Sequence, residues 1–174
     1  MWSRRSIRRS WRIAAALLAG GVALLRAEVN VGDAFPALAT PALVALGTGE
    51  LPATAGQVVL VDFWASWCGP CKASFAALAQ LQKDFAARGL VIAAVSVDEK
   101  PAAAAAFVKK LTPNFPTLHD RDQALVKQVA VPTMPTSYLL GRDGRVRFVH
   151  HGFHGEATER ELRRQIELLL TEKP

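Results

Sequence analysis

The chain has 174 residues, of which 51% are hydrophobic and 21% charged, and its formal net charge is +6. This composition excludes a disordered chain, and the length suits one globular domain, because domains usually hold about 100–200 residues. Residues 1–27 contain six arginines and no acidic residue, so residues 28–174 carry equal numbers of basic and acidic side chains and lack the basic surface that nucleic-acid binding needs.

Residues 1–27 have the pattern of an export signal. A basic segment precedes an apolar run of 13 residues, and Ala27 is a small residue at which a signal peptidase could cut. A helix that spans a membrane usually needs about 20 apolar residues, so this run is short for a permanent anchor. An uncleaved anchor in the inner membrane is the alternative, because Leu25 suits the third position before the cut poorly. We therefore expect residues 28–174 to form one domain in the periplasm.

The first half of that domain alternates between strand and helix patterns. Residues 28–57 show little periodicity and predict an irregular lead-in. Residues 58–64 and 90–97 are apolar runs typical of strands buried on both faces. Between them, apolar residues recur at helical spacing up to Gly89, which is typical of a helix C-terminus. The apolar face of this predicted helix consists of Phe75, Leu78, Leu81 and Phe85.

The second half continues the alternation and then adds a hairpin. Residues 101–111 and 122–129 predict helices, with a short strand at residues 115–118 between them. Residues 136–140 and 145–151 predict two strands, and the Gly-Arg-Asp-Gly sequence between them is typical of a hairpin turn. Strands that alternate with helices before a hairpin predict an α/β fold with a mixed sheet.

A closing amphipathic helix is predicted after the hairpin. Thr158 and Glu161 have the spacing of a capping box, so we expect the helix to begin at Thr158. Its apolar face consists of Leu162, Ile166 and Leu169.

Both cysteines lie in one Cys-Gly-Pro-Cys motif, between a predicted buried strand and a predicted helix. The spacing lets the two sulfur atoms reach bonding distance across one helical turn, and the N–H groups at a helix N-terminus stabilise a thiolate. We predict a redox-active pair in which Cys68 is the exposed nucleophile and Cys71 the buried thiol that resolves the mixed disulfide. A purely structural disulfide is the less favoured interpretation, because closing so short a loop stabilises a fold little.

Asp62 lies six residues before Cys68, inside an otherwise apolar predicted strand. Burial of a carboxylate is costly and should raise its pKa. Because costly buried acids cluster at active sites, we predict that Asp62 accepts the proton of Cys71 during attack on the mixed disulfide. The alternative is an aspartate that is held by local hydrogen bonds and has no catalytic role.

Residues 61–72, Val-Asp-Phe-Trp-Ala-Ser-Trp-Cys-Gly-Pro-Cys-Lys, resemble the active-site segment of thioredoxins. The organisation around them is similar to that of the TlpA/ResA-type thioredoxin-like oxidoreductases, over nearly all of residues 30–170. The resemblance implies a thioredoxin fold, a mixed central sheet flanked by helices, with the helix-strand insert of that branch at about residues 101–119. It also implies a cis bond before Pro135, beside the disulfide, where an extended substrate pairs with the backbone as an added strand. We expect the substrate to contact Trp67, Gly69, Pro70, Met134 and Pro135, although Trp67 is equally compatible with a place in the core.

The chain departs from the TlpA/ResA pattern at three positions. Many members have Asn where Asp62 stands, and the lysine that pairs with this acid in thioredoxins would fall near Ala94. Several members have Glu shortly after the second cysteine, where this chain has Ser74. The resemblance therefore carries over the role of the cysteines but not the details of proton transfer.

The resemblance implies an enzyme that reduces disulfides of periplasmic proteins, such as apocytochrome c or the copper-site proteins of cytochrome oxidase assembly. Its electrons would come from a membrane thiol-disulfide donor, and we expect a monomer that needs no cofactor or metal besides its redox-active disulfide. An oxidase that donates its disulfide is one alternative, since the motif does not give the direction of electron flow. A copper or zinc metallochaperone is another, in which Cys68 and Cys71 would join His150, His151 and His154.

Overall fold

The computed structural model describes residues 28–47 and 49–173, and the predicted leader at residues 1–27 lies outside them. Within the described ranges, no helix has both the length and the apolar composition needed to cross a bilayer. The helices are α1 (Gly69–Phe85), α2 (Pro101–Leu111), α3 (Ala124–Val129), α4 (Glu156–Thr171) and the short 3-10 helix η1 (Ala86–Arg88). The strands are β1 (Leu43–Ala45), β2 (Val58–Trp64), β3 (Leu90–Ser96), β4 (Thr117–Asp120), β5 (Thr136–Leu140) and β6 (Val146–His151).

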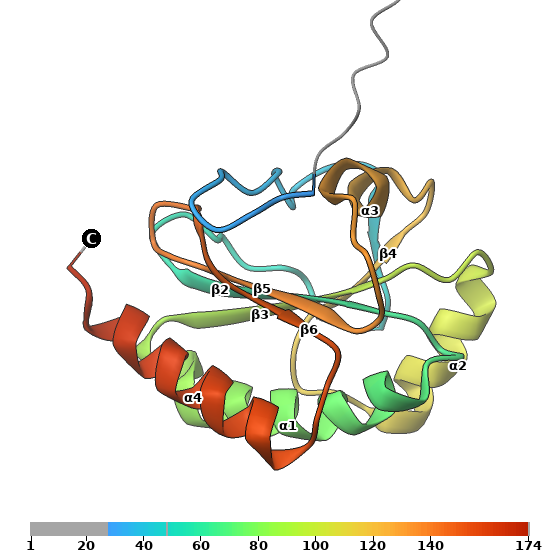
Figure 1. Cartoon of the computed structure of the whole chain (residues 1–174). Coiled ribbons are helices and arrows are strands. Elements are labelled where there is room, and N and C mark those ends of the chain that lie inside the picture. Colours follow the sequence, from blue (N-terminus) through green and yellow to red (C-terminus); the bar gives the residue numbers. More distant parts are fainter. Residues whose placement is uncertain (1–27, 48, 174) are drawn as a thin grey trace, which may run out of the picture.

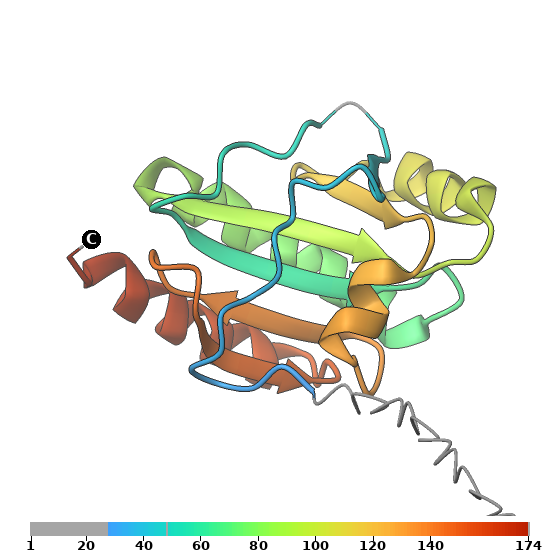
Figure 2. The ribbon, with the colours of Figure 1, turned by 90° about the horizontal axis from the view of Figure 1, so that it is seen from above.

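The strands form one mixed sheet of six strands in the order β1-β4-β3-β2-β5-β6. Strands β2, β3 and β4 run parallel, whereas β1 pairs antiparallel with β4, and β5 pairs antiparallel with both β2 and β6. Helices α1 and α4 lie along one face, and α3 and the lead-in lie over the other (Figures 1 and 2). Every residue of β2 and β3 is buried because both faces are covered, which confirms the α/β prediction and the mixed sheet.

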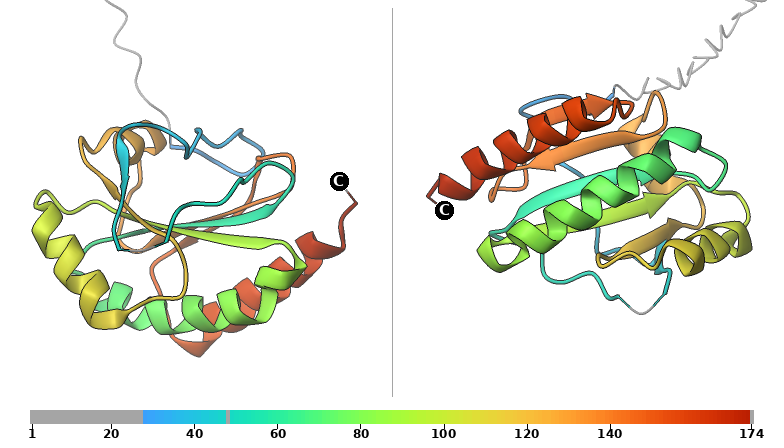
Figure 3. Two further views of the ribbon diagram at one scale, coloured as in Figure 1. Left: turned by 180° about the vertical axis from the view of Figure 1, so that it is seen from behind. Right: turned by 90° about the horizontal axis from the view of Figure 1, so that it is seen from below.

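The predicted apolar faces of α1 and α4 pack against the sheet. Figure 3 shows both helices crossing the same face. Phe75 of α1 contacts Trp64 of β2 edge-on, and Phe107 of α2 stacks on Trp64. Burial of an apolar side chain of this size contributes about 1.5–3 kcal/mol, so these contacts anchor α1 beneath the end of β2. The residues that bury the two predicted faces are Phe75, Leu78, Leu81 and Phe85 of α1 and Leu162, Ile166 and Leu169 of α4.

The structure corrects the predicted lead-in and the short strand. The lead-in contains β1, a strand of three residues that pairs with β4. Strand β4 begins at Thr117 and ends at Asp120, two residues later than predicted. Both errors have one cause: β1 and β4 are too short for a visible periodicity, and they form by pairing with neighbouring strands, β1 with β4 and β4 also with β3.

The predicted start of α4 is also wrong. The helix begins at Glu156, after Gly155, whose φ of 65° lies in the left-handed region that glycine adopts without strain. Thr158 is therefore inside the first turn, where its Oγ1 accepts a hydrogen bond from the backbone N–H of His154 at 3.0 Å. Glu161 pairs with Arg164 instead of capping the helix.

Candidate redox site

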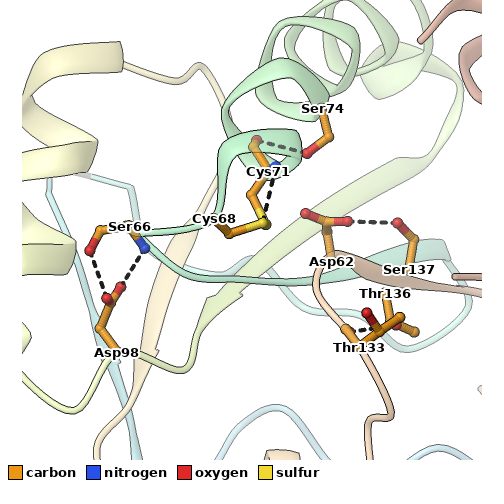
Figure 4. Close-up of a disulfide and its surroundings, with 9 residues drawn as sticks. All are labelled: Asp62, Ser66, Cys68, Cys71, Ser74, Asp98, Thr133, Thr136 and Ser137. Carbon is orange, nitrogen blue, oxygen red and sulfur yellow. Dashed lines mark hydrogen bonds between the residues drawn. A yellow bond between two sulfur atoms is a disulfide. The ribbon is translucent and has the colours of Figure 1, made fainter. Parts of the chain in front are cut away.

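The cysteine pair lies at the start of α1, just after the loop that follows β2 (Figure 4). Cys68 and Cys71 form a disulfide with a Cα–Cα distance of 5.3 Å. Cys68 is the N-cap residue of α1, and its Sγ accepts a hydrogen bond from the backbone N–H of Cys71 at 3.2 Å. Cys68 is 6% exposed and Cys71 is fully buried, so Cys68 is the more accessible of the two but less exposed than predicted. The same N–H can stabilise a thiolate on Cys68 after reduction.

Local sequence explains why α1 begins here. The backbone N–H of Cys68 donates to the carbonyl of Ala65 at 3.1 Å, which closes a turn after β2. Pro70 follows in the first turn of the helix, where the missing N–H of proline leaves no unmet hydrogen bond. The Cys68 sulfur consequently faces the N-terminus of a helix that is anchored by its buried face.

Asp62 is completely buried in β2, and only one of its oxygens has a partner. Its Oδ1 accepts a hydrogen bond from the hydroxyl of Ser137 at 2.6 Å, while Oδ2 has no partner among the described residues. Burial raises the pKa of Asp62 to about 7, although the bond from Ser137 lowers it. In Figure 4 the carboxylate lies between Ser137 and the disulfide. A group with a pKa near neutrality can take up and return a proton under ordinary conditions.

The neighbours of Asp62 follow from the sheet register. Asp62 lies opposite Ser137 of β5 on one side and Ala94 of β3 on the other. Ala94, near which the lysine partner of thioredoxins is expected, is thus the neighbour of Asp62 on β3, and its methyl group cannot neutralise the carboxylate. Desolvation therefore dominates the pKa of this acid.

The bond between Met134 and Pro135 is cis, as the resemblance implied. Thr136, the next residue, lies opposite Phe63, so this register brings Pro135 to the end of β2 from which the cysteine loop leaves. The carbonyl of Pro135 accepts a hydrogen bond from the backbone N–H of Gly152 at 2.8 Å. Within the described residues, the backbone N–H and carbonyl of Met134 have no hydrogen-bond partner, so both are available to an added strand.

The residues around Cys68 form an exposed rim. Trp67 is 73% exposed, so the interpretation of this residue as part of the core is wrong. Gly69 and Pro70 are also exposed, on the other side of Cys68 in the chain. Trp67 and Ser66 line a cavity of about 350 Å³. The rim is a surface that a protein substrate can cover while its sulfur approaches Cys68.

Two of the three histidines of the predicted metal alternative have other partners. Nε2 of His150 is 2.7 Å from Oε1 of Gln165, and Nε2 of His151 is 3.6 Å from a carboxylate oxygen of Glu28. Across residues 28–47 and 49–173, no three or more His, Cys, Asp or Glu side chains form a group that could hold a metal ion. The described structure does not bring the histidines and the cysteines into one site.

Two residues near the disulfide are absent from the sequence-based prediction. Ser137 is the hydrogen-bond donor to Asp62, and no local pattern marks it, because the contact depends on the pairing of β5 with β2. Asp98 lies just after β3 and accepts hydrogen bonds from the backbone N–H and the hydroxyl of Ser66. The sequence does contain a signal for Asp98. Parallel strands end at the same edge of a sheet, so a carboxylate just after β3 lies near the cysteine loop, which follows β2.

Comparisons with known proteins agree with this geometry. Residues 30–166 match the Redoxin family. The thiol-disulfide oxidoreductase ResA of Bacillus subtilis is 36% identical over 97 residues, which cover 56% of this chain and 54% of that protein. ResA of Oceanobacillus iheyensis is 30% identical over 126 residues, covering 71% and 66% of the two chains. These matches thus span about half to two thirds of the length of the curated relatives.

A solved structure covers more of the chain. The crystal structure of a thiol:disulfide interchange protein of the DsbE type from Chlorobium tepidum has a TM-score of 0.70 and 33% sequence identity. The similarity covers 82% of this chain and 99% of that protein. The likeness therefore extends over most of this chain and nearly all of that protein.

Proposed function

Because the chain belongs to the Redoxin family and is of the TlpA/ResA type within the thioredoxin-like proteins, we propose that it is a thiol-disulfide oxidoreductase that reduces disulfides of other proteins. The observation that carries the proposal is the Cys68–Cys71 disulfide, held at the N-terminus of α1 with one cysteine more accessible than the other. The names of its relatives, thiol-disulfide oxidoreductase and thiol:disulfide interchange protein, support the same activity.

Reduction of a substrate begins with Cys68 as a thiolate. Its Sγ forms a bond with one sulfur of the substrate disulfide, the substrate S–S bond breaks, and the other substrate sulfur leaves as a thiolate that takes up a proton. Cys71 then attacks Sγ of Cys68, which forms the Cys68–Cys71 disulfide and releases the second substrate sulfur. Two electrons and two protons have then moved from the dithiol to the substrate.

Asp62 moves the proton in the second step. Cys71 is buried and reacts only after it loses its proton, and Asp62 is the buried carboxylate drawn beside the disulfide in Figure 4. With a pKa of about 7, Asp62 accepts the Cys71 proton as a carboxylate and returns it to the leaving substrate sulfur or to solvent. Its unpartnered Oδ2 is the oxygen free to accept that proton.

The substrate is an extended segment of a disulfide-bearing protein. It pairs with the free backbone groups of Met134 as an added strand and covers the exposed rim at Trp67, Gly69 and Pro70. Backbone pairing is compatible with many substrate sequences, so the choice among substrates depends on contacts with the exposed rim.

The leader predicted at residues 1–27 supports a place outside the cytoplasm, in the periplasm, with or without an anchor in the inner membrane. A dithiol protein of the membrane would then reduce the Cys68–Cys71 disulfide after each cycle. Substrates in cytochrome c maturation or in the assembly of the cytochrome oxidase copper site belong to the same proposal. The electron transfer itself uses only the two cysteines and needs no metal, nucleotide or haem.

A redox titration tests the proposal. The purified protein is equilibrated with thiol buffers of known potential, and the fraction of the Cys68–Cys71 disulfide is measured by alkylation. A potential of about −270 to −220 mV supports a reductase, and a value near −120 mV would make the protein a donor of disulfides instead. A Cys71→Ser variant, which cannot form the pair, serves as the control.

A further inference from the structure

Asp98 holds the loop that carries Cys68 (Figure 4). Its side chain is almost completely buried and accepts three hydrogen bonds. The backbone N–H of Ser66 donates to Oδ2 at 2.9 Å, and the hydroxyl of Ser66 donates to Oδ1 at 2.7 Å. The hydroxyl of Ser96 donates to Oδ2 at 2.8 Å. Both oxygens are therefore in use, and two of the three bonds reach the cysteine loop.

The backbone of Asp98 is fixed in turn by the helix-strand insert. Its carbonyl accepts a hydrogen bond from Nε2 of His119 at 2.8 Å, and Nε2 carries the hydrogen because a carbonyl only accepts. His119 lies in β4 and is buried. The carbonyl of Val97, one residue earlier, accepts from the side chain of Gln123 at 3.1 Å. A continuous set of bonds thus runs from β4 through Asp98 to Ser66.

The cysteine loop depends on this support because it has little regular structure of its own. Residues 65–68 lie between β2 and α1, in neither a strand nor a helix. Trp67 is too exposed to anchor the loop by packing. When the disulfide is reduced, the hydroxyl of Ser66 still links the loop to the body of the fold, two residues before Cys68.

We propose that Asp98 is a positioning residue, which fixes Ser66 and thereby holds Sγ of Cys68 against the N-terminus of α1. The inference rests on the proposed function, because it concerns the reactivity of Cys68 in disulfide exchange. Asp98 touches neither the substrate nor the reacting sulfur atoms in this role. It acts through the geometry of its hydrogen bonds.

Geometry and charge can be separated at this position. In an Asp98→Asn variant the amide oxygen can accept the bonds from the Ser66 N–H and the Ser96 hydroxyl, and the amide NH2 can donate to the Ser66 hydroxyl. This variant keeps the geometry and loses the charge. Asp98→Ala loses both and leaves the Ser66 N–H without an acceptor.

The test measures two rates on the reduced proteins: exchange with glutathione disulfide, and alkylation of Cys68 by iodoacetamide at one pH. We expect both rates to fall about tenfold in Asp98→Ala and to stay close to those of wild type, with less than about a twofold change, in Asp98→Asn. Asp120→Ala is the matched control. Asp120 is also buried and accepts backbone hydrogen bonds, from Ala124 at 3.0 Å and Val126 at 2.8 Å, but these hold α3. We expect Asp120→Ala to lose stability and to keep both rates.

Three results would overturn the positioning role: unchanged rates in Asp98→Ala, equal losses in Asp98→Asn and Asp98→Ala, or an equal loss in Asp120→Ala. If Asp98→Ala does not fold, the same two rates are measured on Ser66→Ala, which removes only the hydrogen bond from the Ser66 hydroxyl to Asp98. A rate lowered about threefold supports the role, and an unchanged rate contradicts it. A wild-type protein that exchanges no disulfides would instead overturn the proposed function, so the two failures are distinguishable.

Discussion

Two buried aspartates flank the cysteine loop, and they differ in how their oxygens are satisfied. Asp62 in β2 has one donor, the hydroxyl of Ser137, and an Oδ2 without a partner among the described residues. Asp98 after β3 has three donors and no free oxygen. Both side chains are almost without solvent contact, so burial alone does not distinguish them.

The difference separates two uses of a buried carboxylate. A carboxylate with a free oxygen and few donors holds a proton near neutral pH, which suits transfer to and from a thiol. A carboxylate whose oxygens are all bonded to a loop makes that loop rigid. We therefore propose different roles for the two residues: proton transfer for Asp62 within β2, and positioning of the cysteine loop for Asp98 just after β3.

Both carboxylates act on a reactive cysteine pair, and loss of that pair has the largest expected effect. Cys68→Ser should abolish reduction of insulin or glutathione disulfide, because no nucleophile remains at the more accessible position. Cys71→Ser should accumulate mixed disulfides with the substrate, since the resolving thiol is gone. Turnover is measured directly, and mixed disulfides are seen on non-reducing gels. Full activity of Cys68→Ser would contradict the mechanism.

Asp62→Asn removes the proton acceptor and should slow resolution of the mixed disulfide about tenfold or more at pH 8. The pKa of Asp62 is about 7, so the wild-type rate should rise as the pH increases through this value and the carboxylate forms. The variant should lack that inflection. Stopped-flow rates between pH 5 and pH 9 check it, and identical profiles would leave Asp62 with a structural role.

The same substitution should stabilise the oxidised protein at high pH. The pKa of Asp62 is raised from 3.8 to about 7, so the folded state binds the proton more tightly than the unfolded state, and stability falls as the pH rises between these values. Asp62→Asn avoids this loss of roughly 4 kcal/mol above pH 7 and gains nothing below pH 4. Urea unfolding at both pH values measures the difference. A gain that is independent of pH would show that the buried charge is not its source.

Ser137→Ala should shift the titration of Asp62 without abolishing it. The hydrogen bond from Ser137 lowers the pKa of Asp62, so its loss should move the rate inflection to higher pH and reduce the rate at pH 7 a few-fold. Ser74→Ala is the control. Its hydroxyl is also buried but donates to the carbonyl of Cys71 and not to Asp62, so its loss should leave the inflection in place. An inflection that does not move in Ser137→Ala would show that Ser137 does not lower the pKa of Asp62.

Trp67→Ala should have the smallest effect on chemistry and a measurable one on substrate binding. The side chain is 73% exposed, so stability should change little. KM for a protein substrate should rise about tenfold while exchange with glutathione disulfide stays within about threefold. Leu168→Ala, at an exposed position of α4, is the surface control. Equal KM values in wild type and Trp67→Ala would remove Trp67 from the substrate surface.

Local patterns predicted the elements that bury long apolar runs or one helical face. Residues 58–64, 101–111 and 136–140 have the predicted bounds. The first helix, α1, ends at Phe85, and Gly89 ends the 3-10 helix η1 that follows it. The short strands β1 and β4 and the start of α4 were missed or displaced. A strand of three or four residues has no periodicity to recognise. Gly155 and Thr158 are both possible N-caps of α4, and only the backbone angles show that the helix begins after Gly155.

The sequence by itself determined the reactive pair, because two cysteines three residues apart at the start of a helix have chemistry that depends on local geometry. It also determined that Asp62 lies within a buried strand, since the residues around it are all apolar. Only the tertiary structure decided which groups meet Asp62 and the cysteine loop. Ser137 lies 75 residues from Asp62, and Asp98 lies 32 residues from Ser66. Such contacts depend on strand order and register, and these are set by the packing of the whole sheet.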